Sequence, residues 1–104
     1  MPTTLHDREQ AFEAKFAHDA ELRFKVEARR NRLLGAWAAG KKGLSGEAAE
    51  AFIGGVIAAD FEEAGDEDVF RKLRSELDAS VSDAAIREKM RECLNAAVAE
   101  VGKA

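Results

Sequence analysis

Few side chains in this sequence have types and spacing suited to metal or nucleophilic chemistry. His6 and His18 lie in a polar N-terminal stretch, where a metal site would need a third ligand such as Asp7 or Asp19. We expect both histidines to be exposed and no metal to be bound. Cys93 falls on the apolar face of an expected helix, which favours a buried, inert thiol over a nucleophile. The glycines match neither common phosphate-binding spacing, and no pair among the 20 acidic residues stands out as catalytic. We therefore expect no enzymatic activity and no cofactor.

Charged side chains gather in two clusters. The basic cluster is Arg23, Lys25, Arg29, Arg30 and Arg32, and the acidic cluster is Asp60, Glu62, Glu63, Asp66, Glu67 and Asp68. The basic residues surround a helix instead of lining one side of it, the net charge is −4, and there is no tyrosine for base stacking. We therefore favour clusters that face each other across the fold or are solvated, and we expect no nucleic-acid partner. A nucleic-acid-binding protein remains an alternative. So does a binding module for a nucleotide or another phosphorylated ligand, held weakly between Arg29 and Arg30.

The elements that must position these groups are four helices. Helix formers and apolar residues at helical spacing predict helices over about 17–39, 46–64, 67–77 and 83–101. Gly40 and Gly65 are expected to end the first two helices, and Asp66 and Ser82 to cap the last two. Two apolar tracks, one of which ends at Phe61, make 46–64 the helix that we expect to be most buried. Because the connections are short and no strand pattern occurs, the sequence predicts an all-α fold, a four-helix antiparallel bundle over residues 20–104.

The first expected helix carries features that a helix packing only a core would not have. Its apolar arc also holds charged residues, among them Glu27 and Arg30, and unpaired buried charges are expensive. For the whole helix-forming stretch from Phe12 to Trp37, we infer that the C-terminal half packs into the domain and that the N-terminal half, with Phe12 and Phe16, is available to something else. Gly35 in this helix, and Gly54 and Gly55 in the next, are expected to leave space for a neighbouring helix.

Residues 1–19 are interpreted as a mobile segment in front of the bundle. Leu5 is the main apolar residue among the first ten, which is too little to order them. Leu5, Phe12 and Phe16 share one face at helical spacing, so the segment could form a helix against a partner. The alternative is that both phenylalanines fold back on the bundle. The N-terminus lacks the apolar core of a signal peptide and no apolar run approaches membrane-spanning length, so we expect a cytoplasmic protein that does not insert into a membrane.

Two long blocks of the sequence resemble a known family. They are REQAFEAKFAHDAELRFKVEARRNRLLGAWAA over residues 8–39 and ADFEEAGDEDVFRKL over residues 59–73. Both resemble the zeta subunit family of bacterial ATP synthase inhibitors. The resemblance implies a four-helix bundle with a mobile inhibitory region that enters the catalytic interface of the F-type ATP synthase and blocks ATP hydrolysis. It implies the catalytic sector of that membrane-bound enzyme as the partner. Carried over to this sequence, the inhibitory segment is residues 1–19, with contacts from Leu5, Arg8, Phe12, Lys15 and Phe16.

Overall fold

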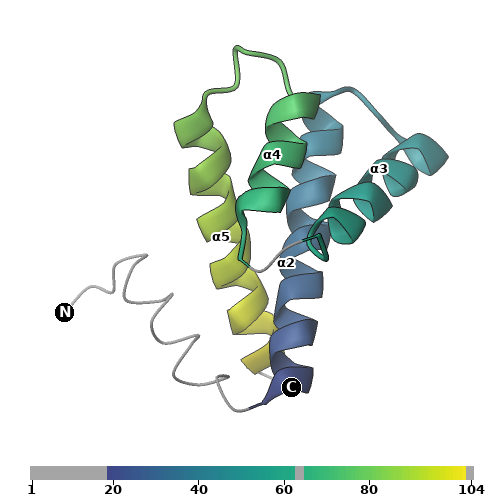
Figure 1. Ribbon diagram of the computed structural model, residues 1–104. Helices are drawn as coiled ribbons and strands as arrows, with labels where there is room; N and C mark the ends of the chain where they lie inside the picture. Colours follow the sequence, from purple (N-terminus) through teal and green to yellow (C-terminus); the bar gives the residue numbers. More distant parts are fainter. Residues whose placement is uncertain (1–18, 63–64, 103–104) are drawn as a thin grey trace.

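The computed structural model describes residues 19–62 and 65–102, and these residues form four helices (Figure 1). The helices are α2 (Ala20–Lys41), α3 (Gly46–Ala59), α4 (Glu67–Glu76) and α5 (Asp83–Gly102). No strand occurs within these two ranges. The all-α prediction is confirmed. The predictions made for residues 1–18 lie outside the described residues.

The four helices pack as an antiparallel bundle. α2 and α4 run in one direction and α3 and α5 in the other, so that the start of α2 and the end of α5 lie at the same end of the molecule (Figure 1). α2 packs against both α3 and α5, while α4 closes the bundle by contacting α3 and α5. Short connections between sequence neighbours produce this arrangement, as the sequence predicted.

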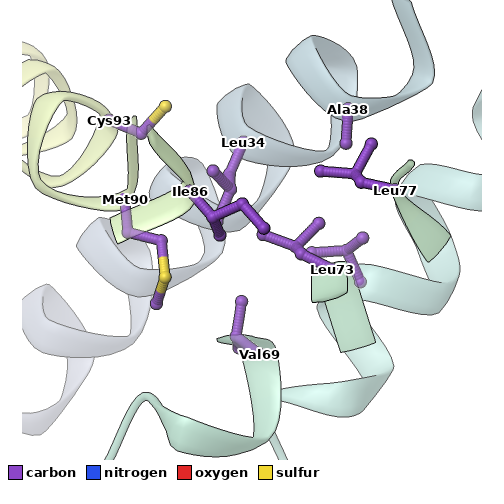
Figure 2. Packing of buried hydrophobic residues seen from close by; sticks show 9 residues of the cluster. Leu34, Ala38, Val69, Leu73, Leu77, Ile86, Met90 and Cys93 are labelled. Carbon is purple, nitrogen blue, oxygen red and sulfur yellow. The ribbon is translucent and has the colours of Figure 1, made fainter. Parts of the chain in front are cut away.

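The core contains residues from all four helices. Figure 2 shows its main cluster, which extends from α2 across α4 to α5. Leu34, Leu73 and Ile86 are fully buried within it. Burying a side chain of this size contributes about 1.5–3 kcal/mol, so the cluster is the main source of stability. A second, smaller cluster joins Val26 of α2 to Ala97 of α5, nearer the start of α2.

The expectation that 46–64 would be the most buried helix is wrong. α3 ends at Ala59, and it has three buried residues where α2 has seven. α2 has more buried residues because it packs extensively against both α3 and α5, whereas one side of α3 faces solvent. After Ala59 the chain tightens into a turn in which the N–H of Phe61 donates to the Ala58 carbonyl at 3.1 Å. Phe61 therefore does not continue a buried track.

One of the helix glycines has the role that the sequence predicted. A Cβ added at Gly35 would lie 3.2 Å from the Ile53 Cα, so this glycine lets α2 and α3 approach closely. The same expectation is wrong for α3, since Gly54 has no atom within 4 Å of such a Cβ and Gly55 has only the Lys72 side chain at 3.7 Å. The left-handed glycine after α2 is Gly43, with φ of 73°, and not Gly40.

Candidate functional site

The junction between the predicted N-terminal segment and the bundle lies at Asp19. Its carboxylate accepts a hydrogen bond from the Leu22 N–H at 3.0 Å, and its backbone is extended, so it is the N-cap of α2. Asp19 and Glu21 also place negative charge at the positive end of the helix dipole. The helix therefore has its own start signal at this position. The predicted partner contacts of the segment lie outside the described residues; they are Leu5, Arg8, Phe12, Lys15 and Phe16.

Beyond this junction, the basic and acidic clusters meet at a buried arginine. Arg30 is 2% exposed, and its guanidinium contacts Asp66 at 3.0 Å, Asp60 at 3.4 Å and the Asn31 side-chain oxygen at 2.7 Å. Burial of a charge is tolerated only when it is paired and hydrogen-bonded. The interaction therefore fixes α2 to the turn between α3 and α4. Asp66 holds the N-cap position of α4, as expected, but its side chain bonds Arg30 and makes no cap bond.

The other basic side chains pair with acids in different places. Arg29 binds Glu100 of α5 through two nitrogens, Arg32 binds Glu50 of α3 at 3.0 Å, and Lys25 pairs with Glu21 at 3.4 Å. Arg29 and Arg30, the residues predicted to hold a nucleotide, thus engage separate carboxylates and do not converge on one cationic site. A phosphate that bound both would have to displace these carboxylates.

An exposed aromatic pair lies beside the buried Arg30 and its partners, because it shares a cavity with Asn31 and Asp60. Phe24 of α2 is 56% exposed and Phe61 is 69% exposed, and their ring centroids are 6.3 Å apart. A small cavity of about 30 Å³ lies at this pair. Its lining is Phe24, Glu27, Ala28, Asn31, Ile57, Asp60 and Phe61. The cavity has space for a methyl-sized group or a single water.

Two carboxylates in this lining have raised pKa values. Burial raises the pKa of Glu27, and the nearby Asp60 charge raises it further. Burial also raises the pKa of Asp60, although the hydrogen bond from Asn31 at 2.9 Å and the charge of Arg30 oppose the change. Glu27 makes no hydrogen bond or ion pair with any residue in 19–62 or 65–102. The apolar pair is therefore bordered by a carboxylate that is not hydrogen-bonded in this range, although the charges of Arg30 and Arg23 act on it from a distance.

Sequence reasoning missed this aromatic pair. It placed Phe61 on the apolar track of a helix that ends two residues earlier, and it did not consider Phe24. A signal for Phe24 was present, because this residue stands between Arg23 and Lys25 and lies off the apolar arc of α2. A phenylalanine that points away from its helix's buried stripe is a candidate contact residue.

Cys93 occupies the core face of α5, as the sequence predicted. It is buried, and burial raises the pKa of its thiol, so the reactive thiolate is suppressed. No group of three potential metal ligands gathers among the described residues. None of the helices in 19–62 and 65–102 has the length and apolar character needed to cross a bilayer.

Comparison with known protein families shows to which family the chain belongs. The family model described as ATPase inhibitor subunit zeta matches residues 2–100. The chain belongs to this family. A comparison with curated proteins finds no match. The zeta match confirms the resemblance seen in the two sequence blocks, and it extends over both the N-terminal segment and the four helices.

Membership in the zeta family supports an inhibitory and regulatory role, and it implies binding to the ATP synthase. The geometry of the described residues suits such a role. The buried Arg30 is paired within the bundle and needs no outside partner, while an exposed aromatic pair with a polar border is typical of a protein-binding surface.

Proposed function

We propose that this protein inhibits ATP hydrolysis by the F-type ATP synthase by inserting residues 1–19, as a helix, into the catalytic interface of the enzyme. The observation that carries the proposal is the zeta-family match, which begins at residue 2 and includes all of the predicted segment except its first residue. The partner is the catalytic sector, and the protein acts in the cytoplasm at the periphery of the membrane-bound enzyme. The contacts in the segment are Leu5, Arg8, Phe12, Lys15 and Phe16.

The energetics of the segment explain why it is joined to a bundle. Ordering some 15 residues costs about 1 kcal/mol or more each in backbone entropy. Burial of Leu5, Phe12 and Phe16 returns only about 1.5–3 kcal/mol each. Helical hydrogen bonds and charge pairs from Arg8 and Lys15 must supply the remainder. A detached segment would therefore bind poorly, whereas a segment on a docked bundle has a high effective concentration.

α2 also lowers the cost of forming the inhibitory helix. Its 22 residues are held by the core, with Val26 and Leu34 fully buried, so a formed helix begins at Ala20, directly after the proposed segment. Starting an isolated helix is unfavourable because several residues are fixed for the first hydrogen bond. A segment that folds against the enzyme next to α2 avoids part of this cost. The Asp19 cap keeps α2 intact when the segment is not engaged.

Substitution of Phe16 tests the proposal. We expect Phe16→Ala to raise the half-inhibitory concentration at least tenfold in an ATPase assay of the cognate synthase, with an unchanged midpoint of thermal unfolding. Phe52→Ala is the matched control, because Phe52 lies on α3 against the main core cluster. It should lower the unfolding midpoint and leave inhibition by the folded protein intact. The reverse ranking of the two variants would make Phe16 a core residue and refute the proposal.

A further inference from the structure

Phe24 and Phe61 form an apolar surface that the bundle itself does not use. Neither residue belongs to the two core clusters, and both are exposed by more than half. They come from different elements, α2 and the turn after α3, and their rings lie 6.3 Å apart. Adjacent exposed phenylalanines with a polar border are typical of interaction sites rather than of inert surface. Phe24 and Phe61 are called the aromatic surface below.

The border of the aromatic surface has a defined chemistry. Ala28 and Ile57 continue the apolar lining, while Glu27 and Asp60 supply carboxylates. Asp60 already accepts hydrogen bonds from Asn31 and Arg30, whereas Glu27 makes no hydrogen bond or ion pair within residues 19–62 and 65–102 and is affected by the charges of Arg30 and Arg23 only from a distance. A group that fits here therefore brings an apolar side chain for the rings. It also brings a cation or N–H donor for Glu27, since a half-buried carboxylate gains from such a partner.

The position of the aromatic surface close to residue 19 favours the synthase as the molecule that provides this group. Phe24 is five residues beyond Asp19, which is about 7.5 Å along the axis of α2. Residues 1–19 are proposed to lie inside the catalytic interface, so the first turns of α2, which follow directly in the chain, lie close to that interface. The aromatic surface is thus continuous with the proposed interface.

We propose that the aromatic surface docks on the rim of the catalytic interface of the synthase. It receives an apolar side chain of the enzyme, and a basic or N–H donor group beside that side chain faces Glu27. This inference rests on the proposed function and adds to it a second contact, made by the folded bundle. The segment blocks catalysis, and the aromatic surface holds the inhibitor in place.

Two substitutions in the full chain test this assignment. Phe61→Ala and Phe24→Ala should each raise the half-inhibitory concentration about tenfold, which corresponds to about 1.4 kcal/mol of binding free energy. Inhibition at saturating protein should stay complete, because the segment is unchanged. The unfolding midpoint of Phe61→Ala should equal that of the wild type, since this side chain is 69% exposed. Phe52→Ala, with the same change of side chain in the core, serves again as the control.

The outcomes separate this inference from the proposed function. If Phe16→Ala weakens inhibition but Phe24→Ala and Phe61→Ala do not, the aromatic surface is not a docking site and the proposed function stands. If Phe16→Ala inhibits like the wild type, the insertion mechanism fails. If the wild type sediments as a dimer and Phe61→Ala as a monomer, a second copy of the chain occupies the surface and docking on the synthase is overturned.

Discussion

Replacing Arg30 with leucine should destabilise the bundle far more than the same change at the neighbouring arginine. Arg30 is 2% exposed and contacts Asp60 and Asp66. Removing one partner of a buried pair costs about 3–5 kcal/mol, because the other charge stays buried. The Asp66 side chain is 56% exposed and can be hydrated again, whereas that of Asp60 is only 13% exposed. We therefore expect the lower end of this range, about 3 kcal/mol.

Arg29→Leu is the matched control for this prediction. Arg29 also pairs across helices, with Glu100, but the two side chains are 42% and 49% exposed. Exposed pairs contribute about 0–1 kcal/mol. In thermal unfolding followed by circular dichroism at pH 7, we expect Arg30→Leu to lower the midpoint by more than about 10 °C and Arg29→Leu by a few degrees. Adding Asp60→Asn to Arg30→Leu should restore part of the loss, because the unpaired charge is then gone. Equal losses in the two single variants would show that the buried network does not fix α2 to the turn between α3 and α4.

Three further predictions concern other parts of the bundle. Gly54→Ala should raise the free energy of unfolding by about 0.5–1 kcal/mol, because alanine favours a helix and the new Cβ meets no atom. Gly35→Ala should lower the free energy of unfolding, because the new Cβ would press on the Ile53 backbone. Urea unfolding of both variants measures the difference. Glu27→Gln should raise the unfolding midpoint at pH 7, and this gain should vanish below about pH 4. The raised pKa of Glu27 means that the folded state binds the proton more tightly than the unfolded state, so the contribution of Glu27 to stability falls as the pH rises above its pKa in the unfolded chain. A gain that is independent of pH would contradict this cause. Cys93 should react with a thiol reagent only as fast as the protein unfolds, so rapid labelling of the folded protein at pH 8 would contradict its burial.

The sequence predicted the fold well because each helix carries its own signals. Apolar spacing placed all four helices, and Ser82 caps α5 as expected, its hydroxyl accepting from the Ala85 N–H at 3.0 Å. The predicted end of α3 was wrong by five residues. Phe61 extends the apolar spacing of the helix, but in the structure Asp60 bonds Arg30 and the chain turns at this point. That interaction joins residues 30 positions apart, and local propensity contains no information about it.

The candidate site was predictable only in part, for a related reason. The sequence showed that the charges on the apolar arc of α2 needed an explanation, and that the basic and acidic clusters could meet. It did not show that Arg30 alone would be buried between Asp60 and Asp66 while Arg29 turns to α5. Which side of α2 is covered depends on how α3 and α5 pack around it, and that arrangement also leaves Phe24 exposed beside Phe61. Pairing and exposure are set by tertiary contacts, so composition and spacing cannot assign them.

The central claim is that residues 1–19 inhibit and the four-helix bundle anchors them. The rate of ATP hydrolysis by the cognate synthase, titrated with the full chain and with a variant that begins at residue 20, tests this claim most directly. We expect the shortened protein to keep its helical circular dichroism signal, to inhibit no hydrolysis by itself, and to relieve inhibition when added in excess over the full chain. Equal inhibition by the two proteins would contradict the account.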